Sequence, residues 1–347
     1  MVINDTPANL GFRMPAEWEK HMGTVMAWPV VEAVWPGPFE EILQAYSDAV
    51  RKISAFEPVT MVAKPELLKQ VREYCGDRVD ILEAVNDDSW IRDNGPTCVI
   101  NNKGEIAGIN WIFNAWGGKY PCENDNKVAS MVLEKYGFPR FDAPLVLEGG
   151  SIHVDGEGTL LTTEECLLNK NRNADMTKEQ IEDTLKQYLN INTVIWLEKG
   201  LFGDDTDGHI DNVACFVRPG VIIVQDCSDP DDPNYDIAKV NIEKLKNSKD
   251  AKGRSLEIIT IEQPRPVYYD DVRLTLSYLN FYFVNGGIIL PVFGKDNRDR
   301  DVYALETLKK VFPDREIVTI DGLPLTRGGG NIHCLTQQIP QGTPAKL

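Results

Sequence analysis

The sequence has no long apolar segment: no run of about eighteen apolar residues, the length that crosses a bilayer, occurs among its 347 residues. Its first residues, Met-Val-Ile-Asn-Asp-Thr-Pro, lack the basic and then apolar composition of a signal peptide. The seven cysteines are odd in number and have no disulfide-framework spacing, which favours free thiols in a reducing compartment. We therefore expect a cytoplasmic protein without a membrane partner.

Motifs for metals and nucleotides are also missing. The sequence contains no Cys-x-x-Cys, no two histidines at zinc-site spacing, and no Gly-x-Gly-x-x-Gly after a strand-like segment. An acidic segment that begins at Asp205 resembles a calcium loop, but Ile210 replaces the turn glycine and Phe216 replaces the bidentate glutamate. These absences predict no metal ion and no organic cofactor.

Basic residues are few: 36 Lys and Arg stand against 53 Asp and Glu, for a formal net charge of −17. Nucleic acid binding needs clustered positive charge, so this balance argues against a nucleic acid partner. It is compatible with a small cationic substrate, although an acidic composition also serves solubility. With 42% hydrophobic residues and no linker, residues 1–347 should form one globular domain, and a homo-oligomer is compatible with this composition.

One cysteine differs from the others in its surroundings. Cys334 ends the sequence Gly-Gly-Gly-Asn-Ile-His-Cys, where the backbone can turn tightly and a ligand can come close. Cys98, by contrast, lies in the apolar sequence Thr-Cys-Val-Ile and has the surroundings of a packing residue. A cysteine is more often a small buried residue than a nucleophile, but the glycine run makes Cys334 the candidate nucleophile.

Four histidines are available to serve as a base, and His209 has the most informative neighbours. It lies in Asp-Thr-Asp-Gly-His-Ile-Asp-Asn, directly before the apolar segment 213–217, which we predict to be a strand. Residues two apart on a strand point to the same face, so His209 and Asp211 should project together from its start. An imidazole beside a carboxylate suits general acid/base catalysis.

The remaining histidines give weaker signals. His153 lies in the alternating segment Ser-Ile-His-Val-Asp, which indicates a structural residue on a half-buried strand. His333 precedes the candidate nucleophile and should point away from it if the segment is extended. His21 has no neighbour that suggests a role.

Two further carboxylates stand beside turn-forming residues. Asp93 directly precedes Asn-Gly-Pro and follows Trp90 by three positions, and Glu148 ends a short apolar segment before a pair of glycines. A solvated turn explains either motif alone. Together with the candidate nucleophile, however, carboxylates at strand ends beside glycines indicate a cleft.

Helix-like and strand-like patterns alternate along the chain. Helices should begin near residues 38, 65, 123, 177, 233 and 300, and Thr177 with Gln180 has the spacing of a capping box. Paired strands are predicted at 151–155 with 158–163, and at 213–218 with 220–225. The later helices recur at intervals of roughly 54 to 67 residues, so about five similar units would fill the chain. Such a repeat favours a propeller or an array over a doubly wound sheet.

Five motifs together resemble those of the agmatine deiminases, which belong to the guanidine-modifying enzymes, or penteins. They are Trp-Ile-Arg-Asp-Asn-Gly-Pro at 90–96, Asn-Ala-Trp-Gly-Gly at 114–118, Leu-Glu-Gly-Gly-Ser at 147–151, Asp-Thr-Asp-Gly-His-Ile-Asp-Asn at 205–212, and the segment 328–334. The resemblance extends from Gly11 to Gln338. It implies a five-bladed α/β propeller of ββαβ units with pseudo-fivefold symmetry and a central site, in agreement with the repeat.

The resemblance implies roles for the matching positions of this sequence. Cys334 matches the nucleophile, His209 the acid/base, and Glu148 the acidic partner of the histidine. The positions that match substrate-binding residues are Asp93 and Asp211 for the guanidinium, Asp205 for a further contact to agmatine, and Trp90 and Trp116 for the aromatic lining.

The implied reaction is hydrolysis of agmatine to N-carbamoylputrescine and ammonia through a covalent amidino-cysteine, without a cofactor. Arginine deiminases and peptidylarginine deiminases are alternatives on the same core, but they must also accept a carboxylate or a peptide. A buried Asp205 and the lack of a nearby basic cluster are unfavourable to both. A non-catalytic polyamine binder is a further alternative, and it would leave Cys334 and His209 without a purpose.

Overall fold

Five mixed sheets and one short hairpin form the β-structure of residues 1–30 and 34–347, which the computed structural model describes. The first sheet contains β19 (Gln337–Pro340), β2 (His21–Ala27), β3 (Val59–Ala63) and β4 (Val79–Glu83). The second contains β5 (Thr97–Asn101), β6 (Glu105–Ile112) and β7 (Arg140–Val146), joined by β1 (Phe12–Arg13) and β20 (Thr343–Pro344). The third contains β8 (His153–Val154), β9 (Thr159–Thr163) and β10 (Thr193–Leu197). The fourth contains β11 (Ala214–Arg218), β12 (Val221–Asp226) and β13 (Glu257–Glu262), and the fifth contains β16 (Tyr282–Val284), β17 (Gly287–Val292) and β18 (Glu316–Asp321).

The longer helices lie close to the predicted positions. They are α1 (Phe39–Ile53), α2 (Leu68–Cys75), α5 (Asp125–Tyr136), α8 (Lys178–Leu189), α9 (Asn234–Lys246) and α10 (Arg298–Val311). Short helices are α3 (Ile91–Asn94), α4 (Ala115–Gly118), α6 (Glu164–Leu167), α7 (Lys170–Asn173) and α11 (Leu323–Thr326). The hairpin pairs β14 (Tyr268–Tyr269) with β15 (Val272–Arg273). The six predicted helix starts are therefore confirmed to within a few residues.

The same order of elements recurs in the five sheets. An antiparallel strand pair is followed by a helix and then by a strand parallel to the second of the pair, as in β11, β12, α9 and β13. The sets β5, β6, α5, β7 and β16, β17, α10, β18 repeat this order. In the first sheet, β19 from the end of the chain supplies the antiparallel partner of β2. The predicted repeat of strands with one main helix is confirmed.

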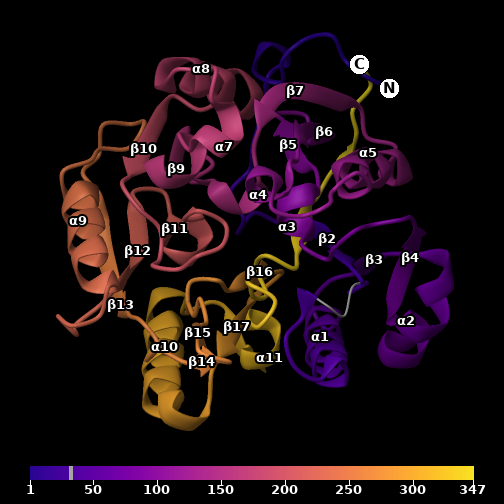
Figure 1. Cartoon of the computed structure of the whole chain (residues 1–347). Helices are drawn as coiled ribbons and strands as arrows, with labels where there is room; N and C mark the ends of the chain where they lie inside the picture. Colours follow the sequence, from indigo (N-terminus) through magenta and orange to yellow (C-terminus); the bar gives the residue numbers. More distant parts are fainter. Residues whose placement is uncertain (31–33) are drawn as a thin grey trace.

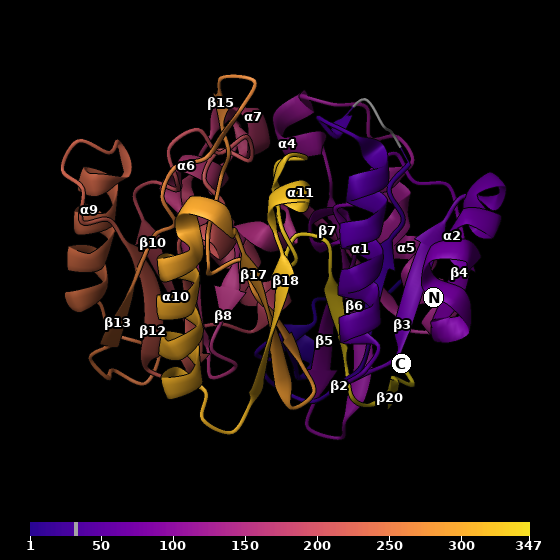
Figure 2. The ribbon, with the colours of Figure 1, turned by 90° about the horizontal axis from the view of Figure 1, so that it is seen from below.

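Figure 1 shows the sheets side by side around the middle of the molecule, with the long helices toward the outside. The two termini lie close together at the periphery. Turned by 90°, the molecule carries α4, α7 and the hairpin that contains β15 along one face (Figure 2). The segments that bear the sequence motifs extend from several different sheets.

The residue pattern of each element explains why it is buried. The apolar stripe of α1, including Ile42, Tyr46 and Val50, is buried, while two acidic residues lie in the first turn and two basic residues in the last. Residues 221–224 of β12 are apolar and all buried. β12 pairs in parallel with β13, and the helix that connects two parallel strands covers a face of their sheet. Residues 1–30 and 34–347 contain no helix long and apolar enough to cross a membrane.

Candidate active site

Each segment that joins one sheet to the next contributes a polar or thiol side chain to one cluster. The contributors are Asp93 between β4 and β5, Glu148 between β7 and β8, His209 and Asp211 between β10 and β11, Asn280 between β13 and β16, and Cys334 between β18 and β19. Every one of these side chains is buried. The fold therefore brings together residues that are separated by up to 241 positions, which is the difference between 334 and 93.

The thiol of Cys334 lies on the wall of a cavity of about 470 Å³. The polar and aromatic residues of the cavity wall are Asp88, Trp90, Asp93, Trp116, Tyr120, Asp205, Thr206 and Arg327. Of the eight predicted site residues, five line this cavity directly and the other three, Glu148, His209 and Asp211, lie behind its wall. The side chain of Cys334 is only 5% exposed, so a reactant must enter the cavity to reach it.

A turn at residues 332–335 presents the thiol to the cavity. The Sγ atom lies 3.2 Å from the amide Nδ2 of Asn280 and 3.5 Å from Oδ2 of Asp211. A Cβ atom at Gly330 would lie 2.9 Å from this Sγ and 2.7 Å from the Trp90 ring, so a side chain there would crowd both. The glycine run thus has the role that the sequence indicated: it leaves room around the thiol.

Burial raises the pKa of Cys334 well above its ordinary value, and the negative charges of Asp211 and Asp93 raise it further. The hydrogen bond from Asn280 opposes this shift without reversing it. The thiol of the ligand-free protein is therefore protonated at neutral pH. A cation bound between the two carboxylates would lower the pKa again.

Asp93 is held by donors from two other segments. Its Oδ1 accepts a hydrogen bond from the backbone N–H of Gly150 at 2.9 Å, and its Oδ2 accepts one from Nε1 of Trp116 at 2.9 Å. Burial is the main cause of a raised pKa for Asp93, with Asp211 and Glu148 adding to it. The carboxylate is fixed in orientation at the cavity wall.

Asp211 has one oxygen in use and one without a partner. Its Oδ2 accepts a hydrogen bond from Nδ1 of His333 at 2.9 Å, whereas its buried Oδ1 has no hydrogen-bond partner within the described residues. Although burial raises the pKa of Asp211, the interaction with His333 outweighs burial and lowers it. A buried, ionised carboxylate oxygen without a donor is suited to receive an N–H group of a cationic ligand.

Two interpretations of the sequence assumed an extended backbone in this region, which the structure does not have. Residues Ile210–Asn212 form a 3₁₀ turn and β11 begins only at Ala214, so His209 and Asp211 do not meet through the two-residue period of a strand. His333 does not point away from the site, because 332–335 is a turn and not an extended segment. The cause in both cases is backbone curvature in a linking segment, which periodicity does not reveal.

A chain of buried polar contacts supports Asp211 from behind. Nε2 of His333 lies 2.9 Å and 3.0 Å from the two carboxylate oxygens of Glu17, and Nη1 of Arg92 lies 3.3 Å from Glu17 Oε1. Burial and Arg92 lower the pKa of His333, but Glu17 and Asp211 outweigh them and raise it. A charged His333 donates from both ring nitrogens and fixes the direction of Asp211.

His209 lies between two carboxylates. Its Nδ1 is 3.8 Å from Oδ1 of Asp93, and its Nε2 is 3.8 Å from Oε2 of Glu148. Burial lowers the pKa of His209, but Asp93, then Cys166 and Glu148, raise it well above its ordinary value. The predicted pairing of His209 with Glu148 is present, but Asp93 contributes more than Glu148 to the raised pKa of His209.

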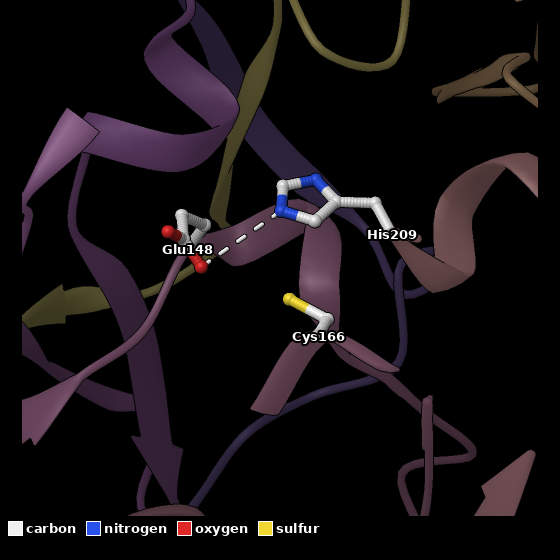
Figure 3. A group of neighbouring side chains, drawn as sticks. All are labelled: Glu148, Cys166 and His209. Carbon is white, nitrogen blue, oxygen red and sulfur yellow. Dashed lines mark ion pairs between the residues drawn. The ribbon is translucent and has the colours of Figure 1, made fainter. Parts of the chain in front are cut away.

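Glu148 has a second cationic neighbour that the sequence did not indicate. Nε of the buried Arg172 donates to Oε1 of Glu148 at 2.7 Å, and its Nη1 donates to Asp207 at 2.7 Å. Burial raises the pKa of Glu148, but His209 and Arg172 outweigh it and lower the pKa. Figure 3 shows Glu148 and His209 turned toward each other, with the Cys166 thiol beside them. Arg172 lies in Asn-Lys-Asn-Arg-Asn, an ordinary polar helix sequence, which carries no such signal.

Gly150 separates the functional side chains. A Cβ atom at this position would lie 2.6 Å from Nδ1 of His209 and 2.9 Å from both Oδ1 of Asp93 and Oδ2 of Asp211. These three polar groups therefore surround a point that any side chain would occupy. The absence of a side chain at residue 150 is a requirement of the site's geometry.

Asp205 does not have the environment that was predicted. Its side chain is 53% exposed at the cavity rim and not buried, and its Oδ2 accepts a hydrogen bond from the Tyr120 hydroxyl at 2.9 Å. Lys119 lies 3.7 Å from Oδ1 of Asp205 and Arg327 lines the same cavity, so the rim does carry positive charge. Both expectations failed because loops that are distant in sequence converge at this rim.

The two predicted tryptophans line the cavity. Trp90 stacks on Trp35 with ring centroids 5.1 Å apart, and Trp116 packs edge to face with Phe113 at 5.2 Å. Trp116 also has a positive φ of 54°, which directs its ring toward Asp93. The aromatic lining is thus rigid and is tied to one of the carboxylates.

Two other histidines belong to the structural interior. His153 is 2% exposed on β8, and its Nδ1 accepts a hydrogen bond from the backbone of Phe216, as expected of a structural residue. His21 pairs with Glu57 at 3.0 Å. Asn280, which the sequence analysis missed, interrupts the aromatic segment Tyr-Leu-Asn-Phe-Tyr-Phe, and such an isolated polar residue was the available signal.

Comparisons with known proteins identify the family of this chain. A family model described as Porphyromonas-type peptidyl-arginine deiminase matches residues 13–340, and the chain belongs to this family. An agmatine deiminase of Pseudomonas aeruginosa (strain LESB58) is 43% identical over 360 residues, which cover 96% of this chain and 97% of the relative.

Two solved structures have the same mixed α/β fold. The agmatine deiminase of Enterococcus faecalis, described as catalysing its reaction, superposes with a TM-score of 0.93 at 36% identity and covers 98% of each chain. A cysteine-to-serine variant of C. jejuni agmatine deiminase with substrate bound has a TM-score of 0.87 at 32% identity, over 96% of this chain and 97% of that one. The resemblance to agmatine deiminases inferred from the motifs is confirmed.

Proposed function

We propose that this protein hydrolyses agmatine to N-carbamoylputrescine and ammonia, with Cys334 as the nucleophile. The observation that carries the proposal is the position of the Cys334 thiol, 3.5 Å from a carboxylate whose other oxygen is buried and has no partner in the described residues. Similarity to agmatine deiminases over nearly the whole chain supports the choice of substrate.

The guanidinium group of agmatine is planar and cationic, and it presents N–H groups along its edges. Oδ1 of Asp211 accepts from one edge, and Asp93, in exchange for one of its present donors, accepts from another. The space left by Gly150 receives this group. Two carboxylates on the same side of the thiol hold the guanidinium carbon within reach of Sγ.

The first chemical step forms a bond between sulfur and carbon. Binding of the cation lowers the pKa of Cys334, and the resulting thiolate attacks the guanidinium carbon to give a tetrahedral adduct. His209, whose pKa is raised, donates a proton to the departing nitrogen, so that ammonia leaves and an amidino-cysteine remains.

The second step regenerates the thiol. His209, now neutral, removes a proton from a water molecule that attacks the amidino carbon. Collapse of this adduct breaks the sulfur–carbon bond, and sulfur leaves as the thiolate. Agmatine and water are consumed, and N-carbamoylputrescine and ammonia are released, so the atoms balance without another reactant. Glu148 keeps His209 oriented and stabilises its charged form.

The outer cavity favours an ammonium group over a carboxylate. Asp88 and Asp205 line it, whereas Arg327, which also lines it, is paired with Glu41 at 2.9 Å. Burial raises the pKa of Asp88 to about 6, so this carboxyl group is largely ionised at neutral pH and would be more so beside a cation. Agmatine carries an ammonium where arginine also carries a carboxylate. Because Asp205 is exposed, we assign it a share in attracting the ammonium and not the main contact.

The five sheets and their linkers also support a finer architecture. We assign residues 1–347 to one domain, a five-bladed α/β propeller of ββαβ units in which β19 completes the first unit. The five linking segments that carry the site are those that meet at the axis of such a propeller. This arrangement accounts for the contribution of one site residue or pair by each linker.

The experiment that tests the function is a paired assay of ammonia release from agmatine and from arginine. The proposal expects release from agmatine at a kcat/KM at least 100-fold above that for arginine, since an unpaired carboxylate in such a site costs several kcal/mol, or about 100-fold. Asp205→Asn should raise the KM for agmatine only a few-fold at low salt. A higher kcat/KM for arginine than for agmatine would instead support the arginine deiminase alternative.

A further inference from the structure

A buried trio outside the cavity has the composition of a metal site. Glu148, Cys166 and His209 each offer one ligand atom, and the three atoms lie within 4.8 Å of one another (Figure 3). All three side chains are buried, and both Oε2 of Glu148 and Nε2 of His209 lack a hydrogen-bond partner among the described residues. Two unpartnered buried ligand atoms thus face one thiol.

The distances suit a small, borderline-soft cation. Nε2 of His209 is 3.8 Å from Oε2 of Glu148, and the sulfur lies within the same 4.8 Å limit. The centre of an equilateral triangle with sides of at most 4.8 Å is no more than about 2.8 Å from its corners, which is within reach of zinc–nitrogen, zinc–oxygen and zinc–sulfur bonds. Thiolate and imidazole ligands select zinc over magnesium or calcium.

The positions of the ligands are set by other contacts. Oγ1 of Thr163 accepts a hydrogen bond from the backbone N–H of Cys166 and donates one to the carbonyl of Gly208, at 3.2 Å and 2.7 Å. This hydroxyl fixes the thiol segment to the histidine segment. Arg172 donates to Oε1 of Glu148 and leaves Oε2 available. The trio is held in place without a cation.

We propose that Glu148, Cys166 and His209 form an inhibitory binding site for Zn²⁺. The three protein ligands leave a fourth position for water. The ion would reach them from the cavity past Asp93, which lines the cavity and lies 3.8 Å from His209. Binding releases the proton of Cys166 and the Nε2 proton of His209, and it occupies the ring nitrogen and carboxylate oxygen needed for acid/base catalysis, a consequence that rests on the proposed function.

The first test compares inhibition by buffered Zn²⁺ in four proteins, the native protein and three variants. For Cys166→Ser and Cys166→Ala, the inhibition constants for Zn²⁺, each measured against the same variant's activity without Zn²⁺, should rise at least ten-fold over the native value, which corresponds to about 1.4 kcal/mol. Cys122→Ala, which removes a half-buried thiol elsewhere, is the matched control and should be inhibited like the native protein. Equal inhibition of all variants would overturn the proposal.

A second test measures metal binding directly, in the absence of agmatine. With Co²⁺ as the probe, thiolate ligation gives a near-ultraviolet charge-transfer band, which should persist in Cys334→Ser and disappear in Cys166→Ser. The reverse pattern would place the metal on Cys334, and absence of the band in the native protein would also overturn the site. Because no agmatine is present, this result is independent of whether the protein hydrolyses agmatine.

Discussion

At the scale of single residues, the proposed binding of the guanidinium group depends on how Asp211 is oriented. Its Oδ2 is held at 2.9 Å by His333, which is itself held by Glu17, and its buried Oδ1 has no hydrogen-bond partner among the described residues. The ring of His333 forms hydrogen bonds to Asp211 and Glu17, so its effect on the proposed substrate passes through Asp211. It is a positioning residue, and its substitution should change KM more than kcat.

We predict that His333→Ala lowers kcat/KM for agmatine by about 10- to 100-fold, mainly through KM, since a hydrogen bond to a charged group contributes about 1.5–3 kcal/mol. Glu17→Gln, which keeps a hydrogen bond to His333 but removes the charge, should have a smaller effect in the same direction. His21→Gln, at a buried histidine paired with Glu57, is the control for general destabilisation. An unchanged KM in His333→Ala would contradict the positioning role.

A further residue-scale prediction concerns the ionisation of Cys334. Because the pKa of this thiol is raised, its alkylation by iodoacetamide should be slow at pH 7 and should accelerate only as the pH rises above the ordinary thiol value, about 8.5. A non-reactive guanidine that binds the two carboxylates should shift the profile to lower pH, at about 1.4 kcal/mol of coupling per pKa unit. Cys334→Ser supplies the background rate. A profile already at its maximum at pH 7 without ligand would show that the carboxylates do not suppress the thiolate.

At the scale of elements, the helix signals of the sequence were reliable where local contacts decide the structure. The capping box predicted at Thr177 is present, with reciprocal hydrogen bonds between Thr177 and Gln180, and α8 begins at Lys178. The linking segments were predicted less well. The turn at Ile210–Asn212 and that at 332–335 depend on partners from other sheets, and no periodicity encodes those partners.

The capping box gives a prediction for this scale. Thr177→Ala should destabilise the first turn of α8 by about 1 kcal/mol, because the backbone N–H of Gln180 loses its acceptor. Hydrogen exchange of the peptide that covers residues 177–189 should then become about five-fold faster at the start of the helix. Thr184→Ala, which removes an exposed hydroxyl bonded within the same helix, should leave the exchange rates unchanged. Equal protection in both variants would mean that tertiary packing alone maintains the helix start.

At the scale of the whole molecule, the repeat of about five units and the residues that carry the motifs were predictable from the sequence. The predicted catalytic and guanidinium-binding residues stand beside glycines or turn-forming residues, and these local features made it possible to identify them from the sequence. They are Cys334, His209, Asp93, Asp211 and Glu148. Arg172, Glu17 and Asn280 were not predicted, because they take part only through contacts with other segments. The environment of Asp205 was misjudged for the same reason, since Lys119 approaches it from another segment and Arg327 lines the same cavity.

The five linkers converge on one thiol, and the central claim is that this thiol attacks the guanidinium carbon. Intact-protein mass spectrometry of a reaction with agmatine, quenched in acid during turnover, tests it most directly. We expect a mass increase equal to agmatine minus ammonia, located at Cys334 by peptide mapping and absent from Cys334→Ser, which should be inactive yet folded. Turnover of agmatine by the serine variant at the native rate, or an adduct on another residue, would contradict the account.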